Sequence, residues 1–162
     1  MGGSAILAMS QVTQTSDYKP LISIPDGIPD FPFQHPRLDP RAVKAFVIAG
    51  HGNLAAVKQM LEAEPGLLNA SVDWGNGDFE QAIEGAGHMG NREITLYLLS
   101  KGARLNLFCA AMLGELDFVK SLLTAHPDLK SSLGPHGISL IRHCEEGGEH
   151  AAEVLAYVKS LG

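Results

Sequence analysis

Long apolar runs, clustered like charges and cysteines are all scarce in this 162-residue sequence, and each scarcity excludes a class of protein. No stretch approaches about 18 consecutive apolar residues, so we expect no membrane-spanning helix. Lys and Arg number 12 against 18 Asp and Glu, and no run of five like charges occurs. Because nucleic-acid binders gain affinity from clustered basic residues, we expect no nucleic-acid partner. Cys109 and Cys144 are the only cysteines and lie in apolar, helical-looking settings, which predicts buried free thiols.

The short motifs that identify common enzymes and metal sites are also absent. No HExxH, CxxC, GxSxG, P-loop or GxGxxG pattern occurs. His136, His143 and His150 are evenly spaced, but Gly147 and Gly148 interrupt any helix that would align them. We therefore expect no metal, no cofactor and no catalytic residues.

Residues 1–37 differ from the rest of the chain because prolines recur every few residues. This spacing forbids a continuous helix and favours extended backbone. We predict a disordered start over 1–16, followed by an extended arm on the surface of a domain that spans 38–162; a flexible tail throughout is the alternative.

The opening MGGSAILAMSQ has a short apolar run without a basic region before it, so it is a poor signal peptide. This favours a cytoplasmic protein. Export is the alternative, if a signal segment precedes Met1.

Helix signals begin at LDPRAVKAFVIAGHGN, where Asp39 is a good N-cap and Pro40 occupies the first helical position. From here short apolar-periodic segments alternate with glycine-containing breaks, and no clean two-residue alternation occurs. We predict an all-α fold in which the helices come in pairs. Four similar segments are centred on the glycines of these breaks, namely Gly52, Gly90, Gly114 and Gly148.

These segments carry small residues before the glycine and apolar pairs after it, as in AAMLGELDFVKSLL. Together with GNREITLYLLSKGARLN, they resemble a divergent, bacterial type of ankyrin-repeat protein with about four repeats. The family's Thr-Pro-Leu-His start of the first helix appears nowhere intact. The resemblance implies a solenoid of stacked helix pairs that binds proteins. Between Asn106 and Leu107 there is no room for the family's β-hairpin finger, so a helix should follow directly there.

The stretch DWGNGDFEQAIEGAGHMGN, residues 73–91, corresponds to an unusually long finger loop. Gly75 and Gly77 permit positive φ in a tight turn. Asp78 with Gln81 has the form of a capping box, and Trp74 and Phe79 could pin the loop by burial.

The same stretch carries a surplus of carboxylates beside a lone tryptophan, which suits a basic partner. In an ankyrin-like stack, His51 and His88 would lie one above the other near the groove. A solvated position or a helix-dipole role is an alternative for both, and an acid–base pair of Asp78 or Glu80 with His88 is conceivable.

We accordingly expect a monomeric module that binds a protein or peptide, with a basic partner favoured, on its concave face and the finger loop at 73–80. The alternative is a small-molecule binder or enzyme with a pocket between that loop and the N-terminal arm. The nominated partner-binding residues are Trp74, Asn76, Asp78, Glu80, Glu84, His51, His88 and His136.

Overall fold

The computed structural model describes residues 25–29 and 32–162, and contacts divide the chain into Met1–His35 and Pro36–Gly162. The predicted disordered start at 1–16 and much of the predicted arm lie outside the described residues. The described part of the arm forms a turn at 26–27 and no helix or strand. Packing of the arm on the domain stays a prediction. No helix within the described ranges has the length and apolar character needed to cross a membrane.

The described residues are mostly helical, as predicted. The eight α-helices are α1 (Pro40–Gly50), α2 (Leu54–Ala63), α3 (Ala82–His88), α4 (Arg92–Ser100), α5 (Leu107–Leu113), α6 (Leu116–Ala125), α7 (Leu140–Glu146) and α8 (Ala152–Ser160).

Side-chain caps set where several of these helices begin. The Asp39 carboxylate accepts a hydrogen bond from the Arg41 backbone N–H, and Pro40 is the first residue of α1, both as predicted. Asn53 and Asn106 cap α2 and α5 in the same way. Each cap satisfies a backbone donor that the first helical turn leaves unpaired.

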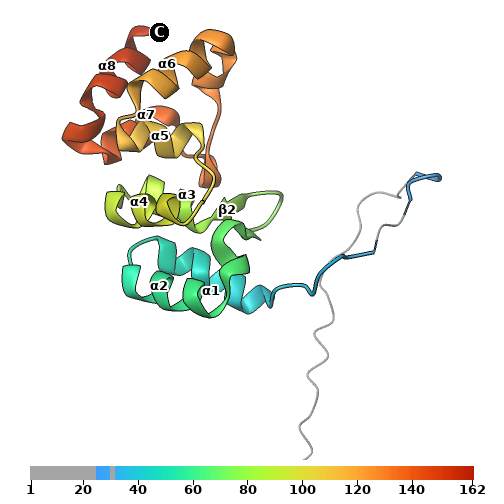
Figure 1. Ribbon diagram of the computed structural model, residues 1–162. Helices are drawn as coiled ribbons and strands as arrows, with labels where there is room; N and C mark the ends of the chain where they lie inside the picture. The colour runs from blue at the N-terminus through green and yellow to red at the C-terminus, as the bar shows by residue number, and fades with distance from the viewer. Residues whose placement is uncertain (1–24, 30–31) are drawn as a thin grey trace, which may run out of the picture. The chain divides into compact units, whose positions relative to one another are not determined.

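The odd-numbered helices pack on one another in chain order, α1 on α3, α3 on α5 and α5 on α7, and each also packs on the helix that follows it (Figure 1). The helix pairs are therefore adjacent in the order in which they occur in the sequence. Small residues allow the close approach. A Cβ on Gly50 would overlap the carbonyl of Ala82, and one on Gly114, at φ 82°, would overlap the carbonyl of His150.

Two clusters of buried apolar residues fill the spaces between these layers. The first surrounds Phe46 and Ile83 in α1 and α3, and the second surrounds Leu140 and Val154 in α7 and α8. Cys109 belongs to the first cluster and Cys144 to the second, and both are buried free thiols, as predicted.

Three different connections join the helix pairs. The first contains the 3₁₀ helix η1 (Pro65–Asn69) and an antiparallel hairpin of β1 (Ser71–Asp73) and β2 (Phe79–Gln81), which we call the β1–β2 hairpin. Each strand has only three residues, which is too short for an alternation of apolar and polar residues to be recognised in the sequence. In the second connection α5 begins at Leu107 directly after its Asn106 cap, as predicted.

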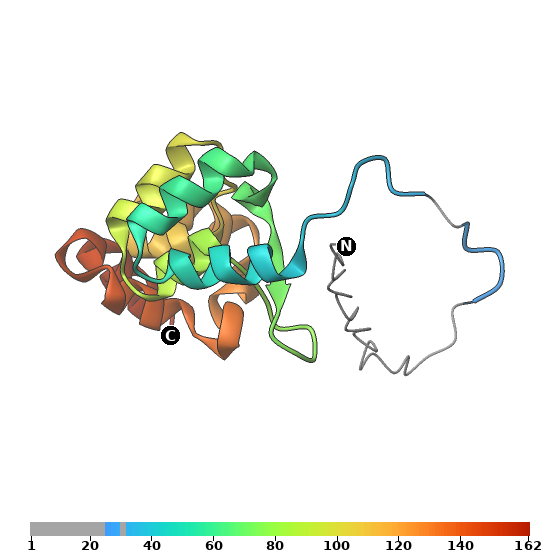
Figure 2. The same ribbon diagram turned by 90° about the horizontal axis from the view of Figure 1, so that it is seen from below.

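The third connection is long again. It runs through the 3₁₀ helices η2 (Pro127–Ser131) and η3 (Pro135–Gly137) and closes with an isolated bridge between Leu133 and Ser139. We call residues 132–139 the His136 loop. Figure 2 shows the β1–β2 hairpin in green beside the orange segment that carries this loop.

Candidate functional site: a glutamate ringed by histidines

Glu80 lies at the centre of the candidate site and its side chain is 0% exposed. The extended backbone of β2 places Phe79 in solvent and Glu80 in the interior, because successive side chains of a strand point to opposite faces. The Trp74 indole N–H donates to Glu80 Oε2 over 2.7 Å. His88 Nε2 lies 2.8 Å from Glu80 Oε1. Burial of a carboxylate is costly unless it is hydrogen-bonded, and here both oxygens have partners.

Three histidines from different elements surround this carboxylate. His51 caps the C-terminus of α1 and has its Nε2 3.3 Å from Glu80 Oε1. His88 ends α3, and its ring centroid is 4.9 Å from that of His51. His136 belongs to the His136 loop and has its Nε2 3.5 Å from Glu80 Oε2. The two histidines predicted to lie above one another therefore do so, and a third joins them.

Other contacts orient two of the three rings. His51 Nδ1 lies 3.0 Å from the carbonyl oxygen of Val47, which can only accept, so Nδ1 carries the proton. His136 Nδ1 lies 2.8 Å from Asp78 Oδ2, and the His136 backbone N–H donates to Asp78 Oδ1 over 2.9 Å. His136 also has φ 60°, an uncommon value for a residue with a side chain. Asp78 thus fixes both the backbone and the ring of His136.

A glycine gives the His51 ring its place. A Cβ at Gly85 in α3 would lie 2.7 Å from Cε1 of His51. Any side chain at this position would force the ring away from Glu80. The small residues of α3 therefore serve the site as well as helix packing.

The surroundings shift the pKa values of the acidic and basic groups in opposite directions. Burial raises the pKa of Glu80, but the hydrogen bonds from His88 and Trp74 and the charge of His51 outweigh it and leave the pKa lowered. The hydrogen bond from the His136 backbone lowers the pKa of Asp78. Partial burial lowers the pKa of His136, but Asp78 and Glu80 together raise it above its ordinary value. Both shifts favour a charged Asp78–His136 pair.

Four atoms in this cluster could bind one metal ion. One ligand atom from each of His51, Glu80, His88 and His136 can be chosen so that all four lie within 4.8 Å of one another. The same four side chains can also form a hydrogen-bonded network by themselves. Sequence spacing gave no sign of this set, since no two of its members form a local metal-binding motif.

Six of the eight nominated residues meet here, and two do not. Asn76 is exposed at the tip of the β1–β2 hairpin with φ 56°. The Glu84 carboxylate accepts hydrogen bonds from the Gln81 backbone N–H and from Asn106 Nδ2, each over 2.8 Å. Burial raises the pKa of Glu84. Glu84 therefore joins α3 to the start of α5.

The predicted structural roles of Asp78 and Phe79 are wrong. Asp78 does not cap a helix, because β2 continues the extended backbone to Gln81, which is the N-cap of α3. Phe79 is 59% exposed and pins nothing by burial. The positive φ predicted for Gly75 and Gly77 is confirmed, at 124° and 82°.

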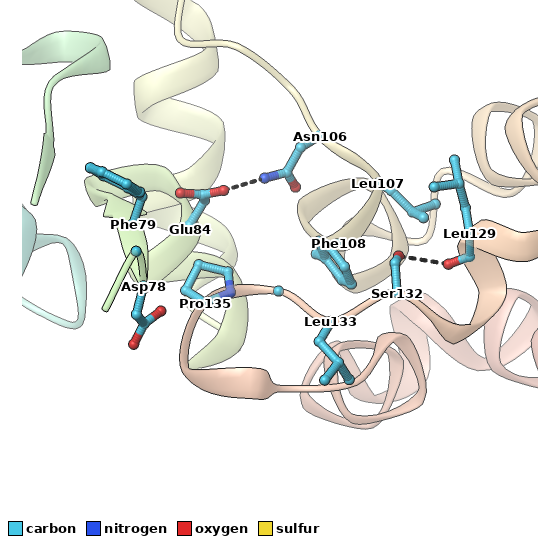
Figure 3. Close-up of a pocket in the computed structure, with 12 residues that line it drawn as sticks. Asp78, Phe79, Glu84, Asn106, Leu107, Phe108, Leu129, Ser132, Leu133 and Pro135 are labelled. Carbon is cyan, nitrogen blue, oxygen red and sulfur yellow. Dashed lines mark hydrogen bonds between the residues drawn. The ribbon is translucent and has the colours of Figure 1, made fainter. Parts of the chain in front are cut away.

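A groove of about 440 Å³ lies beside the cluster, between the β1–β2 hairpin and the His136 loop (Figure 3). Phe79 and Glu84 line one side, Leu133 and Pro135 the other, and Phe108 lies between them. Leu133 is 62% exposed. This groove could not be predicted from sequence patterns, because its two sides are distant along the chain.

A second hollow of about 430 Å³ lies where the chain enters α1. It is lined by Arg37 and Leu38, by Lys44 of α1, and by Val72 and Asp73 of β1. Of the predicted arm only Arg37 lines this hollow, so a pocket between the finger loop and the arm stays a prediction.

The chain matches no protein-family model and no curated protein.

Proposed function

We propose that this chain is a binding module made of about four helix pairs of ankyrin-repeat type, and that its partner is a protein or peptide. The order in which the helices pack supports the proposal, since each pair contacts the next along the sequence. In repeat stacks of this kind the connections between pairs project from one side and form the binding surface. Fold alone does not determine function, so the proposal rests on the groove.

The observation that carries it is the exposure of large apolar side chains on both sides of the groove. Phe79 and Leu133 face solvent across a hollow that has Phe108 at its centre. Exposed apolar groups gathered in a concavity are typical of interaction sites. A short segment with apolar side chains would cover them.

Charge favours a basic partner. The chain carries a formal net charge of −6, and Asp78 and Glu84 lie along the groove. Complementary charge mainly increases the rate of association and selects against acidic competitors. We therefore propose an apolar segment that also carries Lys or Arg.

The nominated residues would act mainly by holding this surface in shape. Glu80 is fully buried and cannot touch a partner, and His88 is nearly so. The Asp78–His136 contacts hold the β1–β2 hairpin against the His136 loop and so fix the two sides of the groove. A rigid surface binds with a smaller loss of conformational entropy.

The test is affinity capture by the full chain, with captured peptides identified by mass spectrometry. The Phe79→Ser/Leu133→Ser variant should lose capture of the same peptides by tenfold or more, because apolar anchors dominate such interfaces. Phe118→Ser/Leu96→Ser is the matched control, since these side chains are also exposed but lie on the outer helices α6 and α4. Equal capture by the groove variant and the control would exclude the groove as the binding site.

The second hollow supports an alternative, a small-molecule binder. Arg37, Lys44 and Val72 line it with one carboxylate, Asp73, and the two cationic groups beside an apolar surface suit an anionic organic molecule. A thermal-shift screen with such molecules would test it. Lys44→Glu, which reverses an exposed charge at the hollow, should abolish any stabilisation found without affecting peptide capture.

A further inference from the structure

We propose that the cluster around Glu80 is a binding site for one divalent transition-metal ion, with His51, Glu80, His88 and His136 as the ligands. This site is separate from the groove and does not depend on the function proposed for it.

The donor set selects the class of ion. Three imidazole nitrogens and one carboxylate oxygen suit Zn²⁺ and its neighbours such as Co²⁺ and Ni²⁺, whereas Mg²⁺ and Ca²⁺ prefer oxygen ligands throughout. Both cysteines are buried elsewhere in the apolar clusters and would contribute no sulfur. Zn²⁺ with four protein ligands is therefore the best match.

The distances are compatible with one ion only after the ligands close in. In tetrahedral coordination, ligand atoms bound to zinc at about 2.0–2.1 Å lie about 3.4 Å from one another. The four candidate atoms lie within 4.8 Å of one another, so the widest separation must close by about 1.4 Å. His136 can move toward the other three ligands, because it belongs to a loop and its side chain is 34% exposed.

Outer contacts already orient two of the three imidazole ligands as metal-binding residues require. In metal sites the second imidazole nitrogen is normally held by a carbonyl or a carboxylate. The Val47 carbonyl holds Nδ1 of His51, and the Asp78 carboxylate holds Nδ1 of His136. In the neutral form of each ring, Nε2 therefore carries the lone pair, and in both residues Nε2 faces Glu80.

The carboxylate is held in a similar manner. The Trp74 indole binds Glu80 Oε2, while Oε1 lies near His51 and His88. A cation at this point would lie next to the buried carboxylate of Glu80 and compensate its negative charge. His51 is 28% exposed, so an ion can reach the cluster from the side of His51 and His136.

Such an ion would join four segments that are distant in sequence, namely α1, β2, α3 and the His136 loop. It would hold the β1–β2 hairpin to this loop more firmly than the Asp78–His136 contacts alone. Metal binding should therefore stabilise the fold, since an ion that binds only the native state raises its stability by mass action.

The first experiment uses the full chain, treated with a chelator and then titrated. Zn²⁺ is followed by calorimetry and by the melting temperature, and Co²⁺ by its visible absorption, which reports the coordination of the ion. We expect one ion per chain, a raised melting temperature and a four-coordinate Co²⁺ spectrum.

Variants then identify the ligands. His136→Ala lies in an exposed loop and should leave the fold intact, while it lowers Zn²⁺ affinity about 100-fold or more and changes the Co²⁺ spectrum. Asp78→Asn, which weakens the support of the His136 ring, should lower the affinity about tenfold. His126→Ala is the matched control, because His126 is exposed and outside the cluster, and it should bind as the unaltered chain does.

The proposal is overturned if the chain takes up no stoichiometric Zn²⁺ or Co²⁺, or if His136→Ala binds as tightly as His126→Ala. Circular dichroism of each variant separates loss of a ligand from loss of the fold. Capture of peptides by metal-free protein would leave the groove proposal standing after such a failure.

Discussion

The connections before α3 and α7 resemble each other and differ from the one before α5. The first forms the β1–β2 hairpin, and the third folds back on itself through the Leu133–Ser139 bridge. The second ends at Asn106, which caps α5 immediately. The two long connections meet through Asp78 and His136, and the short one leaves the groove between them. The short second connection thus leaves the space that the groove occupies.

We expect the largest loss of stability from substitution of Glu80, whose carboxylate contacts Trp74 of the first connection and His136 of the third. Glu80→Ala removes the acceptor for Trp74 and His88 and leaves their polar atoms buried without it. We expect a loss of about 3 kcal/mol in the free energy of unfolding, measured by urea denaturation. Glu149→Ala, an exposed carboxylate outside the cluster, should change it by no more than about 0.5 kcal/mol. A similar loss in the free energy of unfolding for both variants would show that the contacts of Glu80 do not stabilise the fold.

The short connection depends on one side chain. Asn106 caps α5 through Oδ1 and donates from Nδ2 to Glu84. Asn106→Ala should cost about 2 kcal/mol, against about 1 kcal/mol for Asn53→Ala, which removes only the cap of α2. Denaturation of both variants tests this, and an equal cost would mean that the bond to Glu84 contributes nothing.

The contact between the long connections should depend on pH in a definite way. The pKa of Asp78 is lowered in the fold, so its contribution is present above its ordinary range and is lost as pH falls through the folded value. The pKa of His136 is raised, so its contribution is lost as pH rises through a folded value above 6.5.

The stability difference between unaltered chain and Asp78→Asn, both free of metal, should therefore be largest between these limits. Denaturation across a pH series measures it. A difference that is constant with pH would show that the two side chains are not an ion pair.

The smallest difference between the two regions is expected in the reactivity of the cysteines. Cys109 lies in the first apolar cluster and Cys144 in the second, so their labelling measures the unfolding of each cluster. Burial raises the pKa of Cys109 to about 12 and that of Cys144 to about 11, so neither should react with iodoacetamide in the native protein at neutral pH. Labelling in increasing urea, read by mass spectrometry, should modify both at the same concentration if the helix pairs unfold together. Separate transitions would show that the two clusters unfold independently.

The sequence predicted those features that depend on near neighbours. The Asp39 cap, the direct start of α5 after Asn106 and the burial of both thiols are set by local residue types. The start of α3 at Ala82 was not predicted. The capping pattern at Asp78 indicated an earlier start, but the next three residues form the extended strand β2 and the helix begins only after Gln81.

The candidate site was predictable as a list of residues but not as an arrangement. His51 and His88 could be placed by their equivalent positions before a turn glycine. Asp78 and His136 are 58 residues apart, and only tertiary folding brings them into contact. A metal site assembled from single residues of four elements has no local spacing, so motif searches pass over it.

The alternation of β2 has a consequence for how this hairpin can vary. Val72 pairs with Glu80, and the neighbouring Asp73 pairs with Phe79. A slip of one residue in this register would exchange the faces, placing a phenyl ring among the histidines and a carboxylate in the groove. Insertion or deletion of a single residue within β2 would therefore abolish both surfaces together, and the backbone of the tip at 75–77 restricts substitution as well, because Gly75, Asn76 and Gly77 all have positive φ.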